Sequence, residues 1–279
     1  DNWSWIPRSG VREAVPLVFV VADDWPVGCE QRDAWMAPFA RRPALGAAVS
    51  RVTGLPTRLP DLSGAAHWAF ASEWLRGRCR TGTGWAFTDS SVVHLGVDRR
   101  DFPTPTASGG AGGGRVLYVG RLDPVKGVPT LVRAVASVPA VTELQVVGPG
   151  DEEQRRDLDR LVAELGLEDR VRFSEADRSA LAAVYRAADV VVFPSEWEEP
   201  FGIVPLEAMA SNVPVIATGT GGSAEFLVDG TNCVLFPPGD AGALAAALTR
   251  VLGDAELRRR LVAGGRRTAA TLTADVVAE

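Results

Sequence analysis

From residue 115 to the end, short apolar runs alternate with segments of helical periodicity. The expected strands cover 116–119, 144–147, 171–173, 190–193, 213–217 and 233–236. The expected helices cover 127–137, 152–165, 178–188, 202–210, 223–227, 241–252 and 255–270. Strands that alternate with helices predict βαβ units and a doubly wound parallel sheet. We therefore expect an α/β fold for this part of the chain.

The first hundred residues give a weaker pattern of the same kind. The apolar run 16–22 is typical of a buried parallel strand, and further strands are expected at 66–71 and 92–95. Helices are expected over 29–40, over 43–51 and from Ser72 onward. Residues 103–114 are so rich in Pro and Gly that they favour a linker. The predicted organisation is a partial N-terminal domain at 1–104, a linker at 105–114 and a C-terminal domain at 115–279.

Composition narrows the class of protein. The net charge of −6 argues against a nucleic-acid partner. Three widely spaced cysteines, no CxxC pair and only two histidines predict neither a zinc site nor a disulfide framework, so we expect a cytoplasmic protein. We interpret His67 and His94 as structural. The sequence contains no run of about 18 apolar residues, so we expect no membrane span. No signal peptide is recognisable. Because the chain begins at Asp1, we interpret it as a fragment.

Ligands of open α/β sheets bind beyond the carboxyl ends of the strands. The loop 120–127 follows one such strand and holds Arg121 and Lys126, five residues apart. Two cations, a close-approaching Gly120 and a following helix N-terminus together suit a diphosphate. Of the 29 basic residues only Lys126 is lysine, and a compact ammonium at a phosphate is a role that arginine does not fill. Two alternatives remain. Lys126 can be a lysine by chance, and the basic loop can be a solvent-exposed turn that binds nothing.

A second loop, after the strand 190–193, leads through Glu199 into a helix that contains Glu207. One carboxylate can meet the tip of a ligand while the other reaches its flank, and an ionised carboxylate accepts two hydroxyl donors at once. The alternative makes Glu199 a partner of the helix dipole and Glu207 an exposed charge. An apolar setting from Val204 to Ala210 disfavours an unpaired acid at Glu207.

These pieces resemble the C-terminal domain of the large family-4 group of retaining glycosyltransferases, also called glycosyl transferases group 1. The matching motifs are Gly-Arg-Leu-Asp-Pro-Val-Lys-Gly at 120–127, Val-Val-Gly-Pro-Gly at 146–150, Val-Arg-Phe at 171–173, Ala-Asp-Val-Val-Val-Phe-Pro-Ser at 188–195, Glu-Pro-Phe-Gly-Ile-Val-Pro-Leu-Glu-Ala-Met-Ala at 199–210 and Thr-Gly-Gly-Ser-Ala-Glu at 220–225. The resemblance implies the GT-B fold, with two Rossmann-like doubly wound parallel-sheet domains, of which the N-terminal one is incomplete here.

The resemblance also implies roles for individual residues. Arg121 and Lys126 would stabilise the donor diphosphate, and Glu199 would face the transferred sugar; these three form the expected catalytic set. The ribose hydroxyls would be held by Glu207. The remaining donor-site residues implied are Gly120, Gly148, Gly150, Phe173, Ser174, Phe201 and Gly202, with Phe173 and Ser174 meeting the base through the backbone and Phe201 and Gly202 acting through their amides.

The first hundred residues resemble, more loosely, the second half of the N-terminal domain of such enzymes. Many members carry a histidine after the strand that matches 16–21, whereas this chain has Ala22, Asp23, Asp24 and Trp25 there. That difference removes the family's histidine role and leaves Asp23 or Asp24 as a weak replacement.

The resemblance implies transfer of a hexose-type sugar from a nucleoside diphosphate sugar to the hydroxyl of a carbohydrate, lipid or small-molecule acceptor, with retention of configuration. Two fixed cations can substitute for a metal ion, so we expect no cofactor and no essential metal. A nucleotide-sugar epimerase or a phosphorylase shares the fold, and a donor-binding fragment without turnover is a further alternative. A dehydrogenase is disfavoured, because no GxGxxG follows an early strand. Contact with a membrane surface stays open.

Overall fold

The computed structural model describes residues 18–32, 35–58, 61–103 and 113–277. The chain divides into two compact units between Val93 and His94. Residues 94–103 therefore belong with the second unit, before the predicted boundary at 104/105. The predicted linker at 105–114 lies almost wholly outside the described residues. Each unit is described by itself.

The first unit contains a parallel three-stranded sheet in the order β1-β2-β3. Its core is the fully buried Trp68, whose ring packs on Phe19, Trp85 and Phe87. The Ser72 hydroxyl accepts a hydrogen bond from the Leu75 amide and so caps the following helix, as N-terminal serines commonly do. The elements are β1 (Val18–Val21), α1 (Trp25–Arg32), α2 (Ala37–Ala40), α3 (Pro43–Thr53), β2 (His67–Phe70), α4 (Glu73–Thr83) and β3 (Ser90–Val92).

The helix expected over 29–40 is wrong. The chain instead ends α1 at Arg32 and starts α2 at Ala37, with Pro38 in its first turn. Proline has no backbone N–H and its ring clashes with the preceding turn, so it is tolerated where a helix begins and interrupts one that tries to continue.

The second unit contains a six-stranded sheet, parallel throughout, in the order β6-β5-β4-β7-β8-β9. The strands are β4 (Arg115–Val119), β5 (Glu143–Val147), β6 (Val171–Ser174), β7 (Val190–Phe193), β8 (Val215–Ala217) and β9 (Val234–Leu235). The helices are α5 (Val128–Ala136), α6 (Glu152–Glu164), α7 (Arg178–Ala187), α8 (Ile203–Ala210), α9 (Ala241–Gly253), α10 (Ala255–Thr271) and α11 (Ala274–Val277), with 3-10 turns η1 (Pro124–Lys126) and η2 (Gly221–Glu225).

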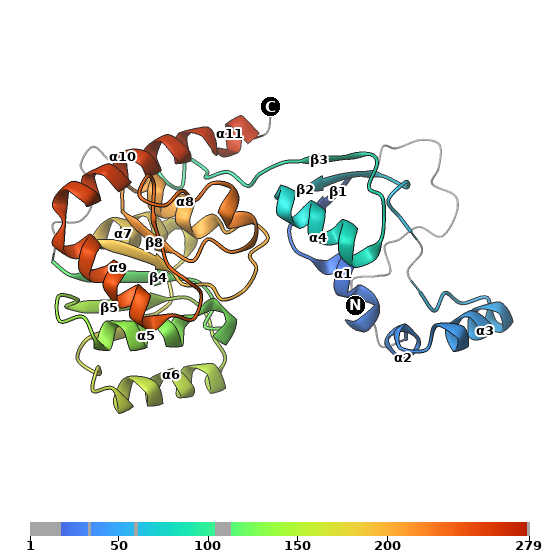
Figure 1. The fold of residues 1–279 in the computed structure, drawn as a ribbon, viewed down its shortest axis with the longest axis horizontal. Helices are drawn as coiled ribbons and strands as arrows, with labels where there is room; N and C mark the ends of the chain where they lie inside the picture. The colour runs from blue at the N-terminus through green and yellow to red at the C-terminus, as the bar shows by residue number, and fades with distance from the viewer. Residues whose placement is uncertain (1–17, 33–34, 59–60, 104–112, 278–279) are drawn as a thin grey trace. The chain divides into compact units, whose positions relative to one another are not determined.

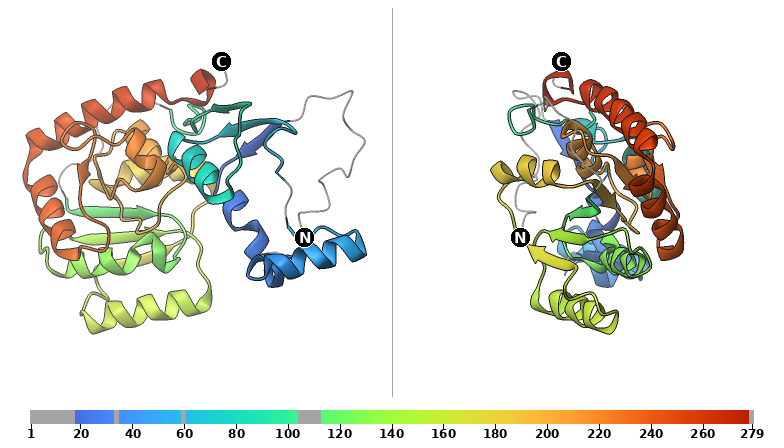
Figure 2. Two further views of the ribbon diagram at one scale, coloured as in Figure 1. Left: turned by 45° about the vertical axis from the view of Figure 1, so that its right-hand side comes forward. Right: turned by 90° about the vertical axis from the view of Figure 1, so that its left-hand side faces the viewer.

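Helices cover both faces of this sheet. Side chains of α5, α6 and α9 form one hydrophobic core with alternate strand residues such as Val116, Tyr118 and Val146. Helix α8 packs on β7 and β8, and α10 lies along α8. Figure 1 shows these layers, with α5 and α6 on one side of the strands and α8 and α10 on the other, and Figure 2 gives two further views. All four residues of β7 are buried, which fits a central strand.

The strand order places a topological switch between β4 and β7. From β4 the chain winds outward through β5 and β6, then returns to β7 on the other side of β4 and continues to β8 and β9. Loops after two adjacent strands that wind in opposite directions diverge from each other, which leaves a crevice at their carboxyl ends. The sheet therefore brings the loop 120–127 and the loop 194–202 to the position where such folds bind ligands.

Candidate functional site

Three of the predicted donor-site residues meet where β4, β5 and β6 end. The Gly120 amide donates to the Val147 carbonyl at 2.9 Å, and the Gly148 amide donates to the Ser174 carbonyl at 2.9 Å. A Cβ on Gly148 would lie 2.1 Å from the Gly120 carbonyl oxygen, and the φ of Gly148 is 147°. Only glycine permits this approach, so the two loops form a floor of closely packed backbone.

The other two predicted residues on this side lie in the same region. Gly150 packs against Leu122, whose Cβ would be 2.7 Å from a Cβ at position 150. The half-buried Phe173 ring carries the Arg155 guanidinium 4.2 Å from its centroid, a cation–π contact. Ser174 follows at the exposed end of β6. Because β6 pairs with β5, Phe173 and Ser174 lie beside the loop that begins at Gly148.

The loop after β4 is shaped by its own hydrogen bonds. The buried Tyr118 hydroxyl donates to the Arg121 carbonyl at 2.5 Å, and the Leu122 amide donates to the Pro149 carbonyl at 2.9 Å. Asp123 accepts from the Val125 amide at 3.2 Å and caps η1. Arg121 is left with a 67% exposed side chain whose guanidinium lies 4.0 Å from the Asp123 carboxylate. Its guanidinium is thus available to an anion from solvent.

Lys126 is the cation that the fold brings into contact with a predicted partner. Its Nζ lies 2.7 Å from the Glu199 Oε1, and the two side chains are only 19% and 9% exposed. The Ser195 hydroxyl donates to the same carboxylate oxygen at 2.6 Å. Lys126 stands in η1, just before α5 rather than inside it. The structure therefore joins the loops of β4 and β7 through one partly buried ion pair.

Backbone contacts hold these two loops together. A Cβ on Gly127 would lie 2.0 Å from the Pro194 carbonyl oxygen, and the φ of Gly127 is 73°. The Glu196 amide donates to the Val125 carbonyl at 2.8 Å. Since each of these contacts needs the other loop in place, Lys126 and Glu199 are positioned by the main chain and do not depend on their ion pair alone.

The segment from Glu199 to Gly202 turns the chain into α8. The Glu199 carbonyl accepts from the Gly222 amide at 2.7 Å, and Gly202 begins the helix with a φ of 85°. Phe201 is 1% exposed, and its ring packs on His94 at 5.4 Å and on Phe226 at 5.1 Å between centroids. The ring is therefore a core group, so a ligand can meet Phe201 only through its main chain, the mode expected from the sequence.

His94 has a structural environment, in agreement with its interpretation from the sequence. Besides stacking on Phe201, its Nε2 lies 2.9 Å from the Glu225 Oε2. His67, in the first unit, bridges Asp89 at 2.7 Å and Ser91 at 2.8 Å. Within the described parts of the chain, no three His, Cys, Asp or Glu side chains gather in a way that could hold a metal ion.

Glu207 lies one turn along α8 and is almost fully buried, with 2% exposure. The Arg178 Nη1 lies 3.0 Å from its Oε1, and the Tyr185 hydroxyl donates to its Oε2 at 2.9 Å. Burial raises the pKa of Glu207, and the hydrogen bonds from Tyr185 and Arg178 oppose that rise. Arg178 also contacts the Asp101 carboxylate at 2.8 Å. Glu207 is therefore a paired acid: its neighbours in the sequence are apolar, but Arg178 and Tyr185 contact its carboxylate.

Sequence reasoning missed the partners of both acids. Ser195 is the last residue of the motif at 188–195, so the motif could have pointed to its place beside Glu199. Arg178 and Tyr185 lie on a helix without any recognised motif, and Asp101 lies far from them in sequence. Only the packing of α7 against α8 brings Arg178 and Tyr185 to Glu207, and Asp101 contacts Arg178.

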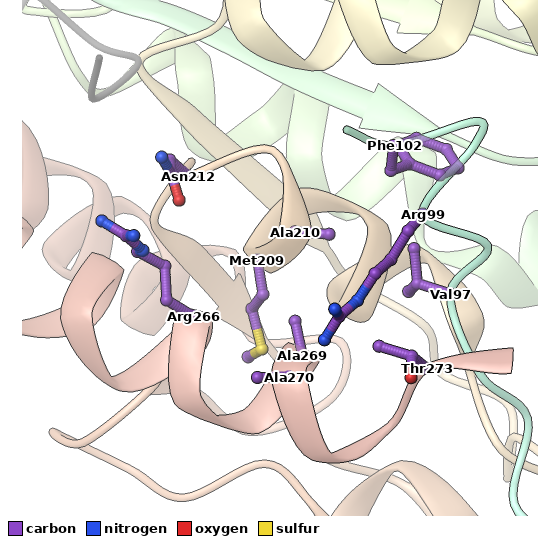
Figure 3. Close-up of a pocket in the computed structure, with 10 residues that line it drawn as sticks. All are labelled: Val97, Arg99, Phe102, Met209, Ala210, Asn212, Arg266, Ala269, Ala270 and Thr273. Carbon is purple, nitrogen blue, oxygen red and sulfur yellow. The ribbon is translucent and has the colours of Figure 1, made fainter. Parts of the chain in front are cut away.

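A separate cavity of about 140 Å³ lies at the other end of α8 and includes none of the predicted site residues. Figure 3 shows Met209 pointing toward the α10 residues Ala269 and Ala270, and Arg99 and Arg266 also line the cavity. The remaining lining residues are Val97, Phe102, Ala210, Asn212 and Thr273. We assign it no part in the candidate site. Along the described residues, no helix combines the length and apolar character that crossing a bilayer requires.

Comparison with known proteins identifies the family of this chain. The family described as glycosyl transferases group 1 matches residues 111–268. The chain belongs to this family. Its fold class is the GT-B class expected from the sequence, with Rossmann-like parallel sheets. Every predicted residue of the donor site falls inside the matched segment, whereas Asp23 and Asp24 lie outside it.

Relatives and solved structures agree with membership of glycosyl transferases group 1. The chain is 39% identical over 175 residues to the D-inositol 3-phosphate glycosyltransferase of Thermomonospora curvata. The matched region covers 59% of this chain and 40% of that protein. The sucrose-phosphate synthase of Thermosynechococcus elongatus superposes with a TM-score of 0.70 and 28% identity, over 94% of this chain and 65% of that one. Anabaena Alr3699/HepE, solved with UDP and glucose, gives a TM-score of 0.71 at 23% identity, over 92% and 67%. The chain thus matches well under half of the first relative's length.

Proposed function

We propose that this chain forms the donor side of a retaining glycosyltransferase that moves a hexose-type sugar from a nucleoside diphosphate sugar to an acceptor hydroxyl. The observation that carries the proposal is the contact between Lys126 and Glu199 beside the β4–β7 switch point, in a chain of glycosyl transferases group 1. A cation and an acid meet there, as a phosphate-linked sugar requires. Arg121 adds a second cation on the same loop.

In the proposed reaction the bond between the anomeric carbon and the diphosphate oxygen breaks. A bond from the acceptor oxygen to the same carbon forms on the same face of the sugar, and the hydroxyl proton passes to the departing diphosphate. Negative charge grows on the diphosphate, so Arg121 and Lys126 stabilise the transition state. Because these two cations offset the negative charge, the proposal includes no cofactor and no essential metal.

Lys126 has two partners in this scheme. Its ammonium carries three N–H donors, one of which points to Glu199. The others are available to a phosphate oxygen, while Glu199 turns its carboxylate toward the sugar hydroxyls. In the proposal the nucleotide lies on the backbone floor that Gly120, Gly148 and Gly150 form by packing on neighbouring protein groups, and Phe173 and Ser174 meet the base. The amides of Phe201 and Gly202 contact the sugar or the phosphate.

Binding and turnover test the proposal separately. Isothermal titration with UDP, GDP and ADP comes first, and we expect one of them to bind in the micromolar range without added metal. Release of that diphosphate from its glucose and mannose conjugates is then measured with myo-inositol, inositol phosphate and simple hexosides as acceptors. Retention is checked from the anomeric configuration of the product by NMR.

Each outcome has a defined meaning. Binding with sugar transfer supports the transferase. Binding of a diphosphate with no transfer to any acceptor favours a donor-binding fragment, the alternative that the 40% coverage of the first relative keeps open. Interconversion of the sugar without transfer would indicate a nucleotide-sugar epimerase. Absence of binding to all three diphosphates contradicts the proposed site. The proposed location is the cytoplasm, where nucleotide sugars are available to such an enzyme.

A further inference from the structure

We infer that Arg178 is a positioning residue that fixes the Glu207 carboxylate for two neighbouring hydroxyls of the donor, the cis-diol of a ribose. The inference deepens the proposed function and depends on it, since it presumes a nucleotide at the β4–β7 crevice. Arg178 begins α7, and Glu207 lies inside α8, so two separate elements create the arrangement.

The geometry of the carboxylate carries the inference. An ionised carboxylate has about four acceptor positions, two on each oxygen. Arg178 occupies one position on Oε1 at 3.0 Å, and Tyr185 occupies one on Oε2 at 2.9 Å. Each oxygen therefore keeps one acceptor position, so the carboxylate, held by two donors, can still accept one hydroxyl on each oxygen. Such a pair matches two adjacent hydroxyl groups better than a single donor.

Arg178 is itself held on other sides. Its Nε lies 2.8 Å from the Asp101 Oδ2, and its guanidinium stands 5.5 Å from the Phe102 ring centroid. The Phe102 ring packs in turn against Tyr185, 5.8 Å between centroids. Residues 101 and 102 thus support both donors that orient Glu207. A guanidinium restrained in this way keeps its planar fork in one direction, which is the property that separates arginine from lysine.

Charge is the second contribution of Arg178. Glu207 is buried, and burial favours the protonated acid, which would offer a donor to a hydroxyl where an acceptor is needed. The charged groups that act on Glu207 are Arg178, which favours the carboxylate, and Asp101, which opposes it. Arg178 therefore favours the acceptor form of Glu207 as well as aligning it.

The test compares a ribonucleotide with its deoxy counterpart on the full chain. The diphosphate that binds best among UDP, GDP and ADP is titrated together with its 2′-deoxy form. The ratio of the two dissociation constants measures the hold on the ribose hydroxyl and is independent of how strongly the diphosphate binds. We expect the wild type to favour the ribonucleotide at least tenfold and Arg178→Met to lower that ratio about tenfold.

Three further variants make the result specific. Arg178→Lys retains the charge without the planar fork, and we expect it to restore part of the ratio. Arg186→Met removes an exposed arginine from the same helix and should leave the ratio unchanged. Asp101→Asn loosens the support of Arg178 at a half-buried position, and we expect an intermediate ratio even if Arg178→Met proves too unstable to measure.

The possible failures are distinguishable. If the wild type binds none of the three diphosphates, the proposed function itself is wrong. If it binds one but does not prefer the ribose form, or if Arg178→Met and Asp101→Asn keep the wild-type preference, the role of Arg178 is overturned while the donor site stands. A parallel loss of affinity for both forms, with the ratio intact, would show a merely structural role and would also overturn the inference.

Discussion

The Lys126 ammonium lies 2.7 Å from the Glu199 carboxylate, although 72 residues separate them in the sequence. Lys126 comes from the loop after β4 and Glu199 from the loop after β7, and these strands are neighbours at the switch point of the sheet. With exposures of 19% and 9%, both groups have given up most of their hydration. Such a pair costs desolvation and is weak support for a stabilising role alone. It is readily explained by a ligand that needs both charges.

The two cations of the loop 120–127 should contribute unequally to the free energy of unfolding. Lys126→Met leaves Glu199 without its cation, and we expect the free energy of unfolding to fall by about 3 kcal/mol. Arg121→Met removes a side chain that is 67% exposed and should change stability by less than about 0.5 kcal/mol. Urea denaturation followed by circular dichroism measures both.

Both variants should weaken the binding of the diphosphate. Each removes one positive charge from the proposed diphosphate site, so each should weaken diphosphate affinity about tenfold or more. Arg133→Met, an exposed arginine on α5, is the matched control and should leave affinity unchanged. Wild-type affinity in both Lys126→Met and Arg121→Met would show that the diphosphate binds elsewhere.

Glu207 should make stability depend on pH. Its pKa is raised in the folded protein, chiefly by burial, so between the unfolded value of about 4.3 and the raised folded value the native state binds more protons than the unfolded state. The contribution of Glu207 is therefore fully present below the unfolded pKa and is lost as the pH rises through the folded pKa. We expect the free energy of unfolding of wild type, minus that of Glu207→Gln, to decrease across this window. Denaturation curves of both proteins from pH 4 to pH 8 measure it, and a flat difference contradicts the raised pKa.

Asp189 should be a strong determinant of stability in the second unit. It is fully buried, and its Oδ2 accepts the Arg115 amide at 2.9 Å and the Arg115 Nε at 3.3 Å. Asp189→Ala leaves the Arg115 amide without this acceptor at the start of β4, and we expect a loss of about 1–3 kcal/mol. Asp169→Ala, at an exposed position, serves as the control. A melting temperature of Asp189→Ala equal to that of the control would contradict this role.

The thiols of Cys79 and Cys233 should report unfolding of the two units. Burial raises the pKa of each to about 12, so little reactive thiolate exists at pH 7.5 while the units are folded. In a Cys29→Ser background, variants that keep only Cys79 or only Cys233 should react slowly with a disulfide reagent in buffer and rapidly in urea. Their urea midpoints then measure the stability of each unit. Rapid labelling of either one in buffer would contradict its burial.

Much of the second unit could be predicted from the sequence because its signals are local. Every strand and helix expected after residue 115 has a counterpart within a few residues, apart from 223–227, which forms a 3-10 turn at Gly221–Glu225. Loop glycines such as Gly127 and Gly202 have positive φ. Because glycine adopts this conformation more readily than other residues, its place in the sequence predicts a turn. In the first unit the periodicity was weaker, and the helix expected over 29–40 failed at a proline.

The sequence by itself determined the parallel α/β architecture and the loops that carry Arg121, Lys126, Glu199 and Glu207, because apolar periodicity and turn residues act over a few neighbouring positions. Only the tertiary structure decided that Lys126 pairs with Glu199 and that Glu207 rests between Arg178 and Tyr185. Those contacts join segments that are distant along the chain, and their geometry follows from how strands and helices pack together. A side chain's pairing partner depends on that packing, and no local pattern encodes it.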